Sequence, residues 1–202
     1  VMRHDEGTKA YSWYLKNKFI RISKIISLEK KIKTKDNKIS YKVLHNYLKF
    51  KTFGNKLLKS FNDNNSKYDG YKKRHKNFWY NLKYHYYANS YKFIIIVFHD
   101  GPNFNYALIG KTKMRDTQYR LDILEFVNYD NSRIHLLDAI DSYAIKINCK
   151  KIRFQTTNNN VDKKTFLKNN FYIRWETNTL VNNISNKKLN FLNYKFFQTE
   201  YI

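Results

Sequence analysis

The order of apolar and polar residues between positions 117 and 184 predicts a strand, a helix, a strand, a polar loop and a further strand. Thr117–Asn128 is rich in Leu, Ile, Phe and Val, which is typical of a strand. Ser132–Asn148 repeats apolar residues at three- and four-residue spacing, as one face of a helix does. Lys150–Thr156 alternates like a strand, and Phe171–Thr179 resumes the strand pattern. A strand, a crossover helix and a further strand predict a compact α+β unit.

The first half of the chain contains two helical patterns and one hairpin pattern. Lys9–Leu28 places aromatic and aliphatic residues at helical spacing with lysines opposite them, and Ile39–Phe50 predicts a second, shorter helix. Lys92–Val97 and Tyr106–Lys111 flank a Gly-Pro turn signal, which predicts a β-hairpin. The tract Asn62–Ser66 is typical of a loop.

Charge restricts the partners of the protein. The chain has 39 Lys and Arg against 16 Asp and Glu, a formal net charge of +23, and such an excess favours binding to polyanions. The abundance of Lys, Asn, Ile, Tyr and Phe, with only 5 Gly and 1 Pro, indicates an AT-biased genome that supplies part of the basic excess. The longest apolar run, Phe93–Phe98, has strand length, so we expect no membrane-spanning helix and no membrane partner.

Tyr71–Lys92 is the most basic and aromatic stretch. Four of its cations form a cluster that could follow a phosphate backbone: Lys72, Lys73, Arg74 and Lys76. Its aromatic residues either stack on unpaired bases or pack against the domain, and the sequence leaves both readings open.

No catalytic or metal-binding motif is evident in the sequence. A single cysteine, Cys149, excludes an internal disulfide and a cysteine-rich zinc site, and we expect a buried, inert thiol. The histidines are scattered without metal-ligand spacing, and His135 is expected on the surface. We therefore predict no cofactor, no metal and no enzymatic activity.

One resemblance favours an enzyme. The hairpin, strand, helix, strand and final FLKNNFY resemble the second half of a GNAT acyltransferase, a fold that holds the pyrophosphate of an acyl-CoA on a Gly-containing loop at a helix N-terminus. The corresponding turn here, Asn128–Arg133, has no glycine and carries Asp130 where an anion should sit. A GNAT-like acetyltransferase, or a degenerate relative, is therefore kept as an alternative.

A second resemblance accounts better for the charge. Asp130–Ile152 is similar to the first helix of the small-subunit ribosomal protein S-ten family, and Arg153-Phe154 with Val161-Asp162-Lys163 is similar to that family's R-F-T…H-V-[ND]-K-D segment. Ile173-Arg174 with Leu180-Val181 resembles its E-I-R-T-H-x-R-L-V-D-I strand, although its Pro-rich segment is absent here. This resemblance implies a ferredoxin-like βαββαβ sandwich over residues 113–202, preceded by a largely helical, basic extension over residues 1–112.

The same resemblance implies a structural constituent of the small ribosomal subunit that binds ribosomal RNA and neighbouring head proteins. Beyond the basic cluster, the residues predicted to bind RNA are Arg133, Lys150, Lys151, Arg153, Lys163, Lys164, Lys168 and Arg174. AT-biased coding favours an organelle-encoded protein of a mitochondrial ribosome in the matrix, one that is not a homo-oligomer. The remaining alternative is a basic accessory subunit of another organellar assembly.

Overall fold

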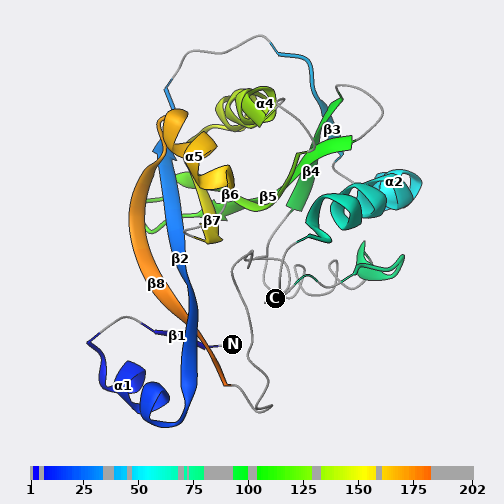
Figure 1. Ribbon diagram of the computed structural model, residues 1–202. Helices are drawn as coiled ribbons and strands as arrows, with labels where there is room; N and C mark the ends of the chain where they lie inside the picture. Colours follow the sequence, from blue (N-terminus) through cyan, green and yellow to red (C-terminus); the bar gives the residue numbers. More distant parts are fainter. Residues whose placement is uncertain are drawn as a thin grey trace.

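The computed structural model describes residues 2–4, 7–33, 39–44, 47–67, 71, 73–79, 93–99, 104–128, 133–157 and 161–182. The fold is built on one mixed sheet of eight strands in the order β1-β8-β2-β7-β6-β5-β4-β3 (Figure 1). The strands are β1 (Met2–His4), β2 (Phe19–Lys31), β3 (Lys42–Leu44), β4 (Phe93–His99), β5 (Phe104–Lys113), β6 (Tyr119–Val127), β7 (Cys149–Thr157) and β8 (Tyr172–Asn182).

Among the described residues, one neighbouring pair of strands is parallel. This pair is β6 and β7, and the six other neighbouring pairs are antiparallel. Strand β2 comes from the start of the chain, yet it lies between β7 and β8 and pairs with both of them. The sheet therefore draws its strands from both halves of the sequence.

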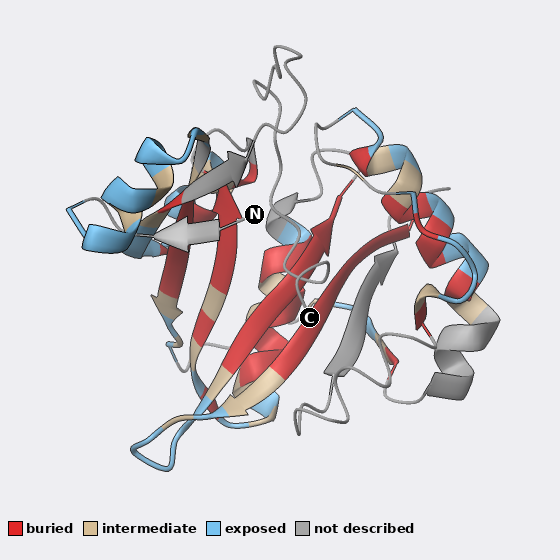
Figure 2. Ribbon diagram, turned by 90° about the horizontal axis from the view of Figure 1, so that it is seen from below, coloured by how far each residue is buried: buried red, intermediate tan, exposed pale blue. Residues whose placement is uncertain are grey.

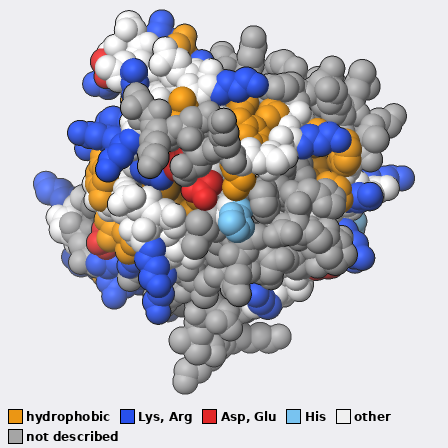
Figure 3. Space-filling model, turned by 90° about the horizontal axis from the view of Figure 1, so that it is seen from above, with side chains coloured by type: hydrophobic (Ala, Val, Ile, Leu, Met, Phe, Trp, Pro, Cys, Tyr) orange, Lys and Arg blue, Asp and Glu red, His pale blue; other side chains and the backbone are white. Residues whose placement is uncertain are grey.

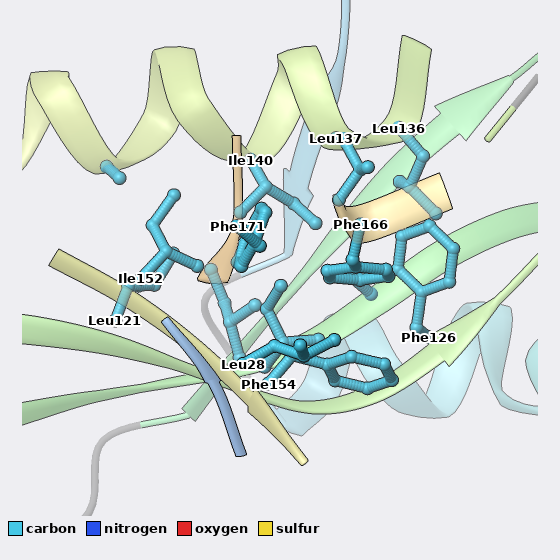
Figure 4. Packing of buried hydrophobic residues seen from close by; sticks show 14 of the residues in the cluster. Leu28, Leu121, Phe126, Leu136, Leu137, Ile140, Ile152, Phe154, Phe166 and Phe171 are labelled. Carbon is cyan, nitrogen blue, oxygen red and sulfur yellow. The ribbon is translucent and has the colours of Figure 1, made fainter. Parts of the chain in front are cut away.

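Helices cover both faces of this sheet. The described helices are α1 (Lys9–Lys16), α2 (Tyr47–Asn65), α4 (Arg133–Lys146) and α5 (Val161–Lys168), of which α4 and α5 pack on one face and α2 on the other. One core joins α4 and α5 to the inner sides of β2, β5, β6 and β7 (Figure 4). Within it, the Phe166 ring stacks on the Phe154 ring with centroids 4.3 Å apart and meets the Phe126 and Phe171 rings edge to face.

A second core lies on the opposite face, between α2 and strands β5 and β6. Adjacent residues of β5 divide between the two cores as a pleated strand requires, since Ala107 and Ile109 belong to the first while Tyr106 and Leu108 belong to the second. The central strands are buried along most of their described length, whereas α1 has no buried residue (Figure 2).

Several elements predicted from the sequence are confirmed. The strand at 117–128, the helix at 132–148, and the strands at 150–156 and 171–179 correspond to β6, α4, β7 and β8. The predicted hairpin is confirmed as the antiparallel pair of β4 and β5.

The predicted ferredoxin-like sandwich with a helical N-terminal extension is wrong. Its two layers cannot include an eight-stranded sheet into which β2 is inserted, and the predicted boundary at 112/113 falls inside β5. The helix expected over Lys9–Leu28 ends at Lys16, and Lys18 adopts a left-handed φ of 62° before β2 begins. The β-branched isoleucines that follow favour a strand, and pairing with β7 and β8 outweighs the helical spacing.

Two shorter predictions are also corrected. The helix expected over Ile39–Phe50 is strand β3 followed by the start of α2, and the loop expected over Asn62–Ser66 continues α2 as far as Asn65. No helix in the described part of the chain has both the length and the apolar character needed to cross a membrane.

Truncation of the buried ring at the centre of the first core should destabilise the protein. Phe166→Ala removes a fully buried ring that contacts three other rings, so we expect a loss of about 3–5 kcal/mol in the free energy of unfolding, measured in urea. The matched control is Leu167→Ala on the same helix, where the residue is 38% exposed and the loss should stay below about 1 kcal/mol. Equal losses for the two variants would contradict this packing.

Candidate functional site

The parallel strands β6 and β7 part before either of them ends. Their pairing runs from Tyr119 opposite Cys149 to Ile123 opposite Phe154. Beyond that point β6 continues to Val127 while paired with β5, and β7 continues to Thr157 while paired with β2. Over residues 124–127 and 155–157, the structure shows no pairing of the two strands with each other. The carboxyl ends of the two parallel strands are therefore not paired with each other, and we refer to this region between them as the gap.

A β-bulge marks the point of separation. Ile109 of β5 pairs with Ile123, and the next residue of β5, Leu108, pairs with Glu125, so Leu124 is an extra residue in β6. A bulge bends its strand and increases the local twist. Leu124 lies in the core beneath α2, as alternation after Ile123 requires, and the extra residue then places Phe126 in the core beneath α4 and α5. The bulge thus explains why β6 leaves β7 where it does.

A buried ion pair lies directly beyond the bulge. Glu125 accepts hydrogen bonds from the Arg74 guanidinium and from the Tyr106 hydroxyl. The guanidinium carbon of Arg74 lies 3.3 Å from the centre of the Phe61 ring and 3.8 Å from that of the Phe78 ring. Both charged side chains are almost completely buried, at 2% and 3% exposure. This pairing attaches the segment 73–79 to the bulged part of β6.

Side chains of α2 hold the same segment in place. The Asn62 amide nitrogen donates to the carbonyl oxygen of Arg74 at 3.0 Å, and the Asn62 amide oxygen accepts from the Arg74 backbone N–H at 2.9 Å. Asn64 donates to the carbonyl oxygen of Asn128, the residue that follows β6, at 2.6 Å. Helix α2 therefore fixes both the segment 73–79 and the end of β6.

Among the described residues, three buried polar atoms of the sheet have no hydrogen-bond partner. They are the Ser27 hydroxyl, the Thr156 hydroxyl and the Asn178 amide oxygen. Thr156 lies on β7 just beyond its last pair with β6, and Ser27 lies on β2 opposite Gln155. A buried hydroxyl without a partner costs about 1–3 kcal/mol, so a ligand that supplied the partner would recover that free energy.

The residues predicted to bind RNA are distributed over separate parts of the fold. Lys72 lies outside the described residues, whereas Arg74 is buried against Glu125 and is not placed to contact a phosphate. Six are exposed on several elements: Lys73, Lys76, Lys150, Lys164, Lys168 and Arg174. Arg133 begins α4, and Lys163 is half-buried in α5. Figure 3 likewise shows Lys and Arg side chains spread around one face of the molecule rather than gathered in a single patch.

The structure brings together three of these residues around β2. Lys151 pairs with Glu29 at 3.2 Å, Arg153 pairs with Asp122 at 2.8 Å, and Arg174 lies on β8 close enough for its charge to act on Glu29. Burial by itself would raise the pKa of Glu29, but the hydrogen bond from Tyr172 at 2.7 Å and the Lys151 ammonium lower that pKa overall.

Sequence reasoning missed the partners of Asp122 and Glu125. Two carboxylates within the apolar run of β6 were the available signal, because a buried carboxylate requires a cation or several donors. The sequence does not show which of 39 Lys and Arg residues fills that role. The predicted burial of Cys149 and exposure of His135 are confirmed, and the described residues contain no group of three potential metal ligands.

Comparisons with known proteins establish the fold. No protein-family model matches the chain, and no curated protein matches its sequence. Among solved structures, a GCN5-related N-acetyltransferase from Sphaerobacter thermophilus matches with a TM-score of 0.59 and 5% identity over 88% of this chain and 57% of its own. A GCN5-related N-acetyltransferase from Anabaena variabilis matches with a TM-score of 0.57 and 13% identity, over 86% of this chain and 43% of its own.

A third similar structure carries no known activity. It is a functionally unknown conserved protein from Staphylococcus epidermidis, with a TM-score of 0.55 and 12% identity over 91% of this chain and 71% of its own. At such low identities the similarity shows the fold alone. The chain has the GCN5-related N-acetyltransferase (GNAT) fold, and it spans about half the length of the two acetyltransferases.

These comparisons overturn the ribosomal interpretation. The similar structures are GNAT-fold proteins rather than S-ten proteins, so the predicted role as a structural ribosomal constituent, the ribosomal RNA and head-protein partners, and the absence of enzymatic activity are wrong. The S-ten resemblance arose from short matches around one strand–helix–strand unit, which the GNAT fold also contains. The mitochondrial location stays a prediction.

Breaking the buried ion pair should strongly destabilise the protein. Arg74→Met leaves the Glu125 carboxylate buried without its cation, so we expect a loss of about 3–5 kcal/mol in the free energy of unfolding, measured in urea. The double variant Arg74→Met/Glu125→Gln removes both charges and should recover most of that loss. Lys73→Met is the exposed control, with an expected change within about 0.5 kcal/mol. A double variant no more stable than Arg74→Met would disprove the pairing.

The Cys149 thiol should resist alkylation in the folded protein. Burial raises its pKa to about 11, against about 8.5 for a free cysteine. At pH 8 the thiolate fraction is then lower by about two orders of magnitude than in the unfolded chain. Labelling with a thiol reagent, followed by mass spectrometry, should be at least that much slower in native buffer than in denaturant. Comparable rates in the two solutions would place this thiol at the surface.

Proposed function

We propose that this protein is an N-acyltransferase that takes its acyl group from an acyl-CoA thioester bound between β6 and β7. The observation that carries the proposal is the separation of these two strands after Ile123 and Phe154. Each strand keeps its outer neighbour, so the gap has two firmly held edges. The GNAT fold supports the same reading.

An extended chain that contains amides fits such a gap. Backbone N–H and C=O groups need hydrogen-bond partners, and an added extended chain can supply them to a strand edge. The pantetheine arm of CoA is a chain of this kind, with two amide groups. Thr156 adds a buried hydroxyl that has no hydrogen-bond partner in the described part of the chain and lies at the start of the gap.

The N-terminus of helix α4 offers a place for the phosphate groups of the acyl-CoA. It begins at Arg133, six residues after Val127, the last residue of β6. A helix N-terminus attracts phosphate through its free N–H groups and dipole. The sequence between the strand and the helix contains Asp130 and no glycine, which works against tight binding of a diphosphate. We therefore expect the pantetheine arm to supply most of the affinity.

The proposed reaction transfers the acyl group to an amine. The amine nitrogen attacks the thioester carbonyl carbon, a C–N bond forms, and the C–S bond breaks. The amine gives up one proton, and the departing CoA thiolate takes up one proton. Backbone N–H groups at the edge of β6 would stabilise the negative charge on the carbonyl oxygen. The pairing of Glu125 with Arg74 would keep this edge in place during the reaction.

Acetyl-CoA binding tests the proposal directly. In isothermal titration calorimetry we expect saturable binding of one acetyl-CoA per chain, weaker binding of pantetheine, and the weakest binding of ADP. Thr156→Val removes the unpartnered hydroxyl at nearly constant volume and should weaken acetyl-CoA binding about 5- to 10-fold, the equivalent of about one hydrogen bond.

The control for this variant is Thr165→Val, the same chemical change at a half-buried position of α5, which should leave acetyl-CoA binding unchanged. In thermal unfolding, Thr165→Val should keep the stability of the wild-type protein, and Thr156→Val should keep or raise it, because it removes a buried hydroxyl without a partner among the described residues. Absence of acetyl-CoA binding at millimolar concentration would refute the proposed function.

A further inference from the structure

A band of charged side chains crosses four strands beside the gap between β6 and β7. It consists of the carboxylates of Glu29 and Asp122 with four cations: Arg120, Lys151, Arg153 and Arg174. Asp122 lies opposite Arg153, which lies opposite Glu29, which lies opposite Tyr172, so the row follows the register of β6, β7, β2 and β8. We refer to this set as the charged band.

The charged band lies on the sheet face away from α4 and α5. Its residues alternate with Leu121, Ile152 and Leu28, which point into the core beneath those helices. As far as the structure describes side-chain burial, the core beneath α2 contains no residue of β7, β2 or β8. The band is also close to the gap, because the pair of Asp122 and Arg153 directly precedes the last pair of β6 and β7, Ile123 and Phe154.

The two carboxylates of the band are more deeply buried than its cations. The Asp122 and Glu29 side chains are 2% and 5% exposed, whereas those of Arg120, Arg153 and Lys151 are 19%, 22% and 30% exposed. Both carboxylates are already satisfied, Asp122 by Arg120, Arg153 and Thr112, and Glu29 by Lys151 and Tyr172. Four cations over two carboxylates leave a surplus of two positive charges toward solvent.

Hydrogen-bond donors remain available in the band. Arg153 bonds Asp122 through Nε, and within the described part of the chain its two terminal nitrogens have no partner. The exposed Arg174 makes no hydrogen bond or ion pair with the described residues. A guanidinium with free N–H groups binds a carboxylate through two parallel hydrogen bonds.

An independent observation concerns Ser27, which lies on β2 two residues before Glu29, on the side toward the gap. Ser27 is completely buried, and its hydroxyl has no hydrogen-bond partner among the residues that the structure describes. It shares the sheet face of Glu29 because the two residues are two positions apart. Ser27 pairs with Gln155 of β7, which borders the gap. A polar ligand atom that passes from the band toward the gap would satisfy this hydroxyl.

We infer that the charged band binds the acyl acceptor, and that this acceptor is an amine whose own molecule carries carboxylates, such as an acidic peptide or a dicarboxylic amino acid. The inference rests on the proposed acyltransferase function. Arg174 and the free nitrogens of Arg153 hold the carboxylate, and Ser27 contacts the chain that leads to the amine. Arg153 lies two residues before Gln155 on β7, which is about 7 Å at about 3.3 Å per strand residue. An amine a few bonds away from the bound carboxylate would therefore reach the gap.

The test compares two peptides that differ only in charge, H-Ala-Glu-Glu-Gly-NH2 and H-Ala-Gln-Gln-Gly-NH2, with acetyl-CoA and the full chain. Each peptide has a single amine, and acetylated product is measured by mass spectrometry. We expect kcat/KM to be at least 10-fold higher for the Glu peptide, mainly through KM, and the preference to shrink as salt rises. A comparison of free glutamate with free glutamine in the same assay shows whether the preferred acceptor is a small amino acid or a peptide.

Substitutions locate the preference on the band. Arg174→Gln should reduce the preference for the Glu peptide at least 5-fold, Arg174→Glu should abolish it, and Arg174→Lys should restore part of it. Ser27→Ala should raise KM for both peptides. Lys168→Glu, an equal charge reversal on exposed α5, is the control and should change neither value.

Equal kcat/KM for the two peptides, or equal effects of Lys168→Glu and Arg174→Glu, would overturn the inference. Inhibition by a short oligonucleotide with no preference for the Glu peptide would also overturn it, in favour of a polyanion site. Direct titration of both peptides without acetyl-CoA separates the two proposals. Binding of the Glu peptide alone, in a protein that does not bind acetyl-CoA, would refute the proposed function and keep the acidic ligand.

Discussion

The separation of β6 from β7 is the feature on which the arrangement of the site depends. Two neighbouring parallel strands normally stay paired along their common length, so a structural cause is needed to part them. The extra residue at Leu124 supplies it, because the bulge turns β6 away while β7 continues along β2. Beyond that point the two strands no longer pair with each other, at the end of the sheet where α4 begins.

The buried ion pair beside the bulge gives this geometry its rigidity. A bulge weakens the local ladder, and an unsupported strand end would be free to pair again with its neighbour. Glu125 is instead bound to Arg74, which is held between two aromatic rings and tied to α2 through Asn62. Desolvation makes such a pair a weak source of net stability. Its value here lies in specifying one position for β6, which a site built from backbone groups requires.

The sequence predicted the elements of the second half and misjudged the assembly. The periodicity of Thr117–Thr179 identified β6, α4, β7 and β8, because each of these elements has a regular apolar pattern of its own. The place of β2 could not be predicted in the same way, since its pairing with β7 and β8 is non-local and its apolar spacing also fits a helix. The bulge left no sequence signal, because Leu124 is as apolar as its neighbours.

The basic composition was the strongest sequence signal, and the fold changes what it means. Some cations are used inside the protein, as Arg74 is by Glu125 and Lys30 is by Asp141. Burial raises the pKa of Asp141 even though the Lys30 ammonium opposes that rise. Others lie over buried carboxylates on the face of the sheet away from α4 and α5, next to the gap. A net charge of +23 raises the local concentration of any anionic molecule. An acyl-CoA and an acidic acceptor are both anions, so one electrostatic field would concentrate both substrates of the proposed reaction.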